Sequence, residues 1–73
     1  MIRDERTHYE IVYYNGKEIV VEKKYYYEDV EIRLWQLRKT NKFLKVFEIK
    51  DIYVNGKCVG VEIKEEEVWQ KLN

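Results

Sequence analysis

The sequence predicts an all-β fold with one short C-terminal helix: a five-stranded antiparallel, SH3-like small barrel in which a β-hairpin packs on a three-stranded sheet. The main observation is that the tripeptide Asn-Gly-Lys occurs at 15–17 and again at 55–57, each time between β-branched and aromatic residues. Asn-Gly in that setting is the strongest short-range signal of a hairpin, because a type I′ turn requires positive φ at both central positions.

The two Asn-Gly turns place a first hairpin over residues 8–24 and join strands 42–54 and 57–64 in a second. Counting outward from each turn gives both hairpins an apolar face, and alternating apolar residues mark the side of a strand that a core buries. We therefore expect both hairpins to close on one core. The residues on this inward face are Val12, Ile19 and Val21 in the first hairpin and Ile52, Val59 and Val61 in the second.

The middle of the chain is predicted to form a further hairpin, in which strand 29–38 pairs with strand 42–54 across a turn at 40–41. One register satisfies two opposite-charge pairs and three apolar pairs, and each such pair contributes roughly 0.2–1 kcal/mol. The pairs are Glu31 with Lys50, Arg33 with Glu48, Ile32 with Ile49, Leu34 with Phe47 and Leu37 with Leu44.

A helix is the alternative for this segment. Val30, Leu34 and Leu37 recur at helical spacing, with Glu28 and Asp29 before them and basic residues after them. That arrangement of charge suits the dipole of a helix. The cross-strand pairs favour the hairpin, because a helix explains none of them.

Two features complete the predicted fold of a single domain, residues 1–73. Ile49 and Ile52 differ in parity, so we expect the strand to change face near 50–51 by a bulge or a bend. The segment 65–72 is predicted to be a short helix that docks on the sheet, because acidic residues precede three apolar ones. These apolar residues are Val68, Trp69 and Leu72.

Composition restricts the functions open to the chain. It has 73 residues and no net charge, which removes the overall electrostatic attraction typical of nucleic-acid and membrane-surface proteins. No run approaches the roughly 18 apolar residues of a membrane span, and one cysteine, Cys58, favours a reducing compartment. We therefore expect a cytoplasmic protein that does not associate with membranes.

Residues for catalysis and cofactor binding are scarce. The chain contains no Ser, one His (His8) and one Cys (Cys58), so a hydroxyl triad is restricted to Thr7 or Thr40 and a thiol dyad to His8 with Cys58. A lone Cys in a strand is more often a small apolar filler, and no Cys/His cluster has the spacing of a metal site. The glycines fall in turns and in a strand, without a phosphate-binding loop. We expect no enzyme activity, no cofactor and no metal.

An unusual number of tyrosines suggests a protein-binding surface. Seven Tyr and two Trp occur in 73 residues, and these side chains concentrate at interfaces because they combine area with a polar tip. A patch on the outer side of the first hairpin and the exposed side of the middle hairpin are predicted to bind a partner protein, through Tyr9, Tyr13, Tyr26, Arg33 and Trp35. The alternative for Trp35 is a place in the core, since small sheets rarely leave a tryptophan unused.

The middle segment also supports a second function, nucleic-acid binding. Residues 33–50 hold six basic side chains against one acidic side chain, Glu48. Phosphate contacts from Arg38, Lys39, Lys42 and Lys45, with base stacking on Trp35, would suit such a role. The acidic residues on either side of this segment weaken this alternative.

The absence of Ala, Ser and Pro beside many Lys, Ile and Tyr residues indicates an AT-rich genome. A phage or virus is a source of that kind. We therefore expect a small non-enzymatic binding module, as either a monomer or a homodimer, that inhibits or regulates a host protein.

Overall fold

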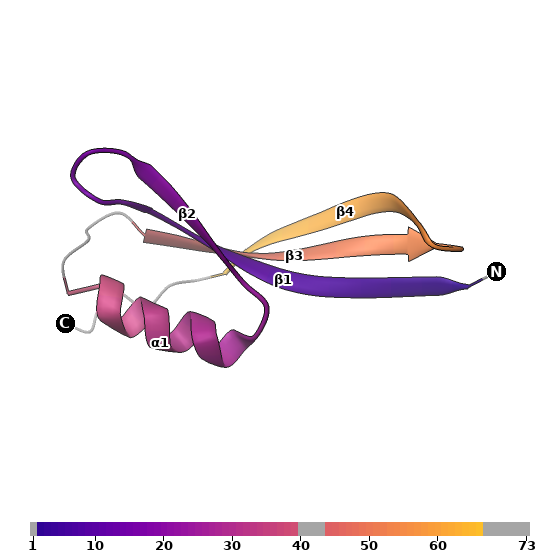
Figure 1. Cartoon of the computed structure of the whole chain (residues 1–73), viewed down its shortest axis with the longest axis horizontal. Coiled ribbons are helices and arrows are strands. Elements are labelled where there is room, and N and C mark those ends of the chain that lie inside the picture. Colours follow the sequence, from indigo (N-terminus) through magenta and orange to yellow (C-terminus); the bar gives the residue numbers. More distant parts are fainter. Residues whose placement is uncertain (1, 40–43, 67–73) are drawn as a thin grey trace.

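The computed structural model describes residues 2–39 and 44–66. Its elements follow the order β1 (Arg3–Tyr14), β2 (Ile19–Lys24), α1 (Tyr27–Leu37), β3 (Leu44–Val54) and β4 (Lys57–Glu66) (Figure 1). The four strands form one antiparallel sheet in the order β2-β1-β3-β4. The fold is mostly β, as predicted, but the sheet is open and four-stranded. The predicted five strands and closed SH3-like barrel are wrong, because the segment expected to supply the fifth strand is α1.

The sheet is long, and α1 covers one end of it. The molecule measures 47 × 23 × 16 Å. β1 pairs with β2 only from Tyr9 to Tyr14 but with β3 from Arg3 to Tyr13, so its first half extends beyond β2. Figure 1 shows that α1 lies under the end that carries β2. The other end, which we call the arm, consists of residues 3–8, 49–54 and 57–63.

Helix α1 replaces the predicted strand 29–38, and the helical spacing of Val30, Leu34 and Leu37 explains why. These residues point toward the sheet, where Val30 is completely buried. Glu28 and Asp29 lie in the first turn, where negative charge stabilises the helix dipole. The predicted cross-strand pairs offered only some tenths of a kcal/mol each, whereas burying a valine side chain contributes about 1.5–3 kcal/mol. The expected middle hairpin therefore does not form.

The core lies between α1 and the sheet. It consists of Ile11, Tyr13, Val30, Leu37, Leu44 and Val46, with Tyr9, Val20 and Leu34 packed against it. The buried side of β1 is thus the side of Ile11 and Tyr13, which is opposite to the predicted inward face. β1 is apolar on both sides in this region, so alternation did not determine which side the helix covers.

The two Asn-Gly turns differ. Asn55 and Gly56 have φ of 50° and 83°, and Val54 pairs with Lys57, which confirms the predicted two-residue turn. The first turn is a four-residue loop instead, because Tyr14 pairs with Ile19. The Asn15 side-chain oxygen accepts hydrogen bonds from the backbone N–H groups of Lys17 and Glu18, at 2.8 and 2.9 Å. This local hydrogen bonding by Asn replaces the tight turn, and the resulting two-residue shift leaves every side chain on its original face.

The predicted change of face in β3 near residues 50–51 is also wrong. β3 keeps one register with β1 throughout, and both Ile49 and Ile52 are buried, on opposite sides of the sheet. The register shift lies between β3 and β4, where Ile52 pairs with Gly60 but Tyr53 pairs with Cys58.

The predicted C-terminal helix, 65–72, is not formed at its start. Residues 65 and 66 continue β4, and the remaining residues of that segment lie outside the described part of the chain. No helix within residues 2–39 and 44–66 has both the length and the apolar character that a membrane span requires.

Candidate protein-binding surfaces

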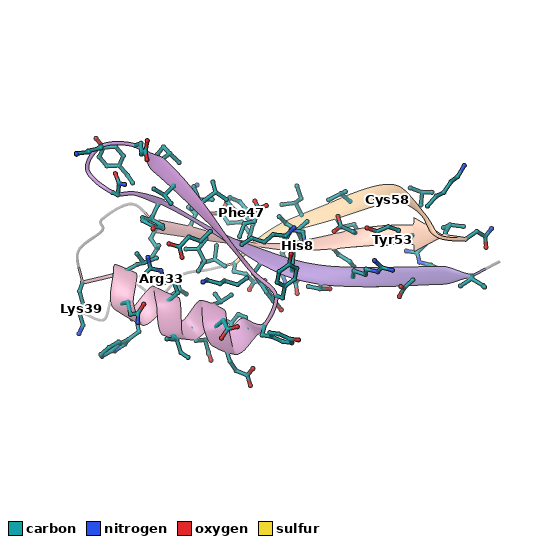
Figure 2. The ribbon with its side chains drawn as sticks, in the orientation of Figure 1. His8, Arg33, Lys39, Phe47, Tyr53 and Cys58 are labelled. Atoms are coloured by element: carbon teal, nitrogen blue, oxygen red, sulfur yellow. The ribbon has the colours of Figure 1, made fainter. Side chains whose placement is uncertain are left out.

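Two residues predicted to bind a partner, Tyr13 and Arg33, instead meet inside the molecule. Glu22 of β2 joins them: Tyr13 donates its hydroxyl to Glu22 Oε2 at 2.5 Å. Arg33 Nε and Nη2 donate to the two carboxylate oxygens of Glu22, each at 2.8 Å. Figure 2 shows Arg33 between α1 and the sheet. We call Tyr13, Glu22 and Arg33 the Glu22 cluster.

The electrostatics of the Glu22 cluster indicate a structural role. Hydrogen bonds from Arg33 lower the pKa of Glu22 from 4.5 to about 2, against the opposing effect of burial. The same pair raises the pKa of Arg33, and the hydrogen bond to Glu22 raises the pKa of Tyr13. Bidentate Arg–carboxylate pairs are among the stronger hydrogen-bonded contacts in proteins. The cluster therefore ties α1 to β2, and we no longer assign Tyr13 and Arg33 to a docking surface.

The other predicted tyrosines are separated by the fold. Tyr9 is half-buried beside α1, with its ring edge-on to that of Tyr27 at 5.5 Å between centroids. Burial, followed by the charges of Glu48 and Glu66, raises the pKa of Tyr9. Tyr26 is exposed, and its backbone carbonyl accepts the N–H groups of residues 29 and 30 at the start of α1. The predicted patch of Tyr9, Tyr13 and Tyr26 does not exist as one surface.

Trp35 is exposed, as the protein-binding prediction required, but on the outer side of a helix. Its side chain is 61% accessible, and that of Ile32, one turn earlier, is 59% accessible. The Lys39 ammonium lies 3.9 Å from the centroid of the Trp35 ring. Residues spaced by three and four lie on one helix face, so Glu28, Ile32, Trp35 and Lys39 form a row, which we call the helix ridge.

The basic residues of the middle segment do not form a finger, because the hairpin that would have carried them is absent. Arg38 is exposed at the end of α1, and Lys39 lies over Trp35. The Lys45 ammonium, on β3, is 3.6 Å from a carboxylate oxygen of Glu65. Lys42 lies outside the described residues. Of the four, Arg38 and Lys39 are adjacent to one another at the end of α1.

Sequence reasoning missed a partly exposed apolar surface, the side of the sheet that faces away from α1, on which Ile49 is buried and Val12 and Phe47 are half-buried. We call it the open face. No described element covers it, and Figure 2 labels several of its side chains, including Phe47 and His8. Neighbouring positions in the strand registers place the following apolar residues on this face: Val12, Tyr14, Ile19, Val21, Phe47, Ile49, Val61 and Ile63. Most of these residues were predicted to lie in the core, so their apolar character was interpreted as that of an interior rather than of a surface.

β4 shows how differently the two sides of the arm are built. Val61 and Ile63 point to the open face, and both are more than half exposed. Glu62 and Lys64 alternate with them and point to the other side. Neither side of β4 is covered by a described element, yet between residues 61 and 64 the apolar side chains point to the open face and the charged ones to the other side.

His8 and Cys58 lie on different parts of the sheet. His8 is mostly buried, with Nδ1 3.5 Å from a carboxylate oxygen of Asp51 and Nε2 3.9 Å from one of Glu10. Cys58 is exposed at the start of β4. Within the described residues, no three His, Cys, Asp or Glu side chains are placed to hold a metal ion.

No family model matches the chain, and neither a curated protein nor a solved structure is detectably similar to it.

Proposed function

We propose that this chain is a small non-enzymatic module that binds a partner protein through the helix ridge. The observation that carries the proposal is the exposure of Ile32 and Trp35 on the outer side of α1. A tryptophan and an isoleucine exposed one turn apart, in a molecule whose own core is small, are typical of interface anchors.

The ridge has the form of a helix that fits into a groove. In that mode of recognition, apolar anchors spaced by one or two turns enter pockets of the partner. Glu28 lies at one end of the ridge and Lys39 at the other. The partner surface that fits is an apolar pocket with a basic side chain near Glu28 and an acidic one near Lys39. Such opposite-charge contacts would set the direction of binding more than its strength.

The amino-acid composition, which is rich in residues encoded by AT-rich codons, supports a phage or viral source, and we extend the proposal accordingly. The partner would be a host protein that the module inhibits or regulates, and the module would act in the cytoplasm. The mixed charge of the surface supports a protein partner over nucleic acid. Arg33 and Lys45 are paired with carboxylates, so they contribute little free positive charge.

Nucleic-acid binding is the second candidate function, and one contact favours it. Lys39 lies on the ring of Trp35, with Arg38 beside it in the chain. A basic group next to an exposed aromatic ring is the arrangement that stacks a base and holds its phosphate. Binding of this kind would weaken steeply as salt is added.

The test compares variants that differ in one surface. Partners captured by the immobilised chain are identified, purified and titrated against wild type, Trp35→Ala, Ile32→Lys and Ile63→Lys. We expect both ridge variants to weaken binding at least about tenfold, which corresponds to about 1.4 kcal/mol. Ile63→Lys is the matched control, because it introduces the same charge at an isoleucine of similar exposure on the open face.

Circular dichroism must show that each variant remains folded. Equal binding by wild type and both ridge variants would contradict the proposal. Titration with single- and double-stranded DNA and RNA at low salt examines the second function. Binding that falls with salt and with Trp35→Ala would replace the first proposal by the second.

A further inference from the structure

We infer that a second copy of this chain covers the open face, so that two sheets pack face to face in a homodimer. The inference concerns a different surface from the helix ridge and does not depend on the proposed function. Four properties of the molecule support it: the residue pattern of the sheet, the small size of the core, and the size and the charge of the open face.

The residue pattern marks the open face as a surface made for burial. A sheet with one side in water normally alternates apolar residues on the buried side with polar residues on the other. β4 follows this rule at Val61 and Ile63 against Glu62 and Lys64. No described element covers this apolar side, so it is left exposed. The same holds for Ile19 and Val21 on β2, both more than half exposed.

The core of one chain is small for an independent domain. Eight hydrophobic side chains are buried among the described residues, and only Ile11, Val30 and Val46 are nearly inaccessible. A chain of about 70 residues buries a modest share of its surface and usually needs a disulfide, a metal or oligomerisation in addition. A single cysteine rules out an internal disulfide. A second copy would supply the missing layer.

The size of the open face suits a dimer. The four strands hold 12, 6, 11 and 10 residues. At roughly 3.3 Å per residue and roughly 5 Å between strands, they cover about 600 Å² in projection. The contoured side-chain surface over that area is larger, and it approaches the roughly 800 Å² per partner of a standard interface. The twist of the sheet does not prevent this, because two sheets of the same hand pack face to face in sandwiches.

The charge of the open face favours a copy of itself over a membrane or nucleic acid. Both signs occur on the face, at Asp4, Arg6, Glu10, Lys23, Lys45, Asp51 and Glu65. Near neutrality of the face and of the whole chain means that two copies do not repel one another. Both signs are also present at each end of the face: Glu10, Lys23, Lys45 and Glu65 lie toward α1, and Asp4, Arg6 and Asp51 lie in the arm. Neither end therefore carries a block of one charge that a second copy, related by a two-fold axis, would have to oppose.

Sedimentation of the full chain over a concentration series tests the inference. We expect the mass of a dimer, and we expect Ile63→Lys and Val21→Lys each to weaken dimerisation at least about tenfold, or about 1.4 kcal/mol. These residues lie on the two opposite edge strands and are already exposed in the single chain, so neither change should unfold it. Ile32→Lys, on the helix ridge, is the matched control and should leave the dimer intact.

Using both edge strands separates a face-to-face dimer from one that pairs edge to edge. A dimer through the β4 edge would respond to Ile63→Lys and not to Val21→Lys, and a dimer through the β2 edge would do the reverse; either result would overturn the inference. A wild-type chain that remains a monomer at every concentration would also overturn the inference. That holds regardless of whether residues 67–73 or another protein then covers the open face.

Cys58 provides an independent measurement, because it is exposed on the open face and is the only cysteine in the chain. A spin label attached there should report one defined distance between two copies. The distance should disappear in Val21→Lys and persist in Ile32→Lys. The absence of any intermolecular distance in the labelled wild type, with sedimentation also showing a monomer, would contradict the proposed dimer.

Discussion

Replacing Glu22 with Gln should destabilise the protein near pH 7 by about 2 kcal/mol, and the loss should vanish in acid. The Arg33 guanidinium holds the pKa of Glu22 at about 2, against an ordinary value of 4.5. Each pKa unit corresponds to about 1.4 kcal/mol, so the difference represents about 3 kcal/mol of favourable interaction with the ionised carboxylate. About a fifth of the side chain is accessible to solvent, and screening there lowers the expected value to about 2 kcal/mol.

The pH dependence follows from the direction of the pKa change. Because the folded protein has the lower pKa, the contribution of Glu22 is complete above about pH 4.5 and is lost as pH falls toward about 2. Gln retains the shape of Glu and still accepts the hydroxyl of Tyr13, but it carries no charge for Arg33. The stability difference between wild type and Glu22→Gln should therefore shrink across that interval.

Urea unfolding followed by circular dichroism, at a series of pH values, measures this difference. Protein concentration must be the same throughout, because a dimer would gain stability from concentration. Glu62→Gln is the matched control: Glu62 is an exposed carboxylate on β4, and its replacement should change stability by less than about 0.5 kcal/mol. A Glu22→Gln protein as stable as wild type near pH 7, or a loss that stays constant into acid, would refute the reasoning.

Four further changes examine the fold. Gly56→Ala should lower the free energy of unfolding by about 1–2 kcal/mol, because the φ of 83° at this position is unfavourable for a residue with a Cβ. Gly60→Ala should be nearly neutral, since only the end of the Ile52 side chain lies within 4.0 Å of the added carbon. Ile11→Ala should cost about 2–5 kcal/mol because the side chain is fully buried. Ile32→Ala should be neutral or slightly stabilising, since alanine forms helix better at an exposed position. Thermal and urea unfolding measure all of these changes. A Gly60→Ala cost equal to that of Gly56→Ala would contradict the positive-φ turn, and an Ile11→Ala cost below about 1 kcal/mol would contradict the place of Ile11 in the core.

The two proposals are compatible in space. α1 lies on the side of the sheet opposite to the open face, so a face-to-face dimer would keep both helix ridges on its outer surfaces. Two ridges on one particle could bind two copies of a partner, or two sites of one partner, with increased avidity. A variant such as Ile63→Lys would then weaken binding to a divalent partner without affecting the affinity of a single ridge.

Local features of the sequence predicted the local features of the structure. The prediction of a two-residue turn at 55–56 was correct, because the geometry of two consecutive residues with positive φ is enough to decide it. Strands 42–54 and 57–64 were close to the observed β3 and β4, but the predicted placement of Ile52 opposite Val59 was wrong, because a register shift pairs Ile52 with Gly60. For Trp35 the sequence left a place on the surface and a place in the core open, and the side chain is exposed, on α1 rather than on a strand.

Only the tertiary structure decided what depended on an element far away in the chain. Residues 29–38 fit either a strand or a helix, and the sheet that buries Val30 selects the helix. The same helix decides which side of β1 becomes the core, because Ile11 and Val12 are both apolar and on opposite sides. Tyr13 and Arg33 therefore belong to the Glu22 cluster and not to the predicted docking surface. Of the predicted inner residues, Val12, Ile19, Val21 and Val61 lie on the open face, whereas Ile52 is buried on the opposite side. Composition and turn chemistry determined by themselves that this is a small, mostly β chain, because both act over a few residues; the buried side of the sheet required the helix to be in place.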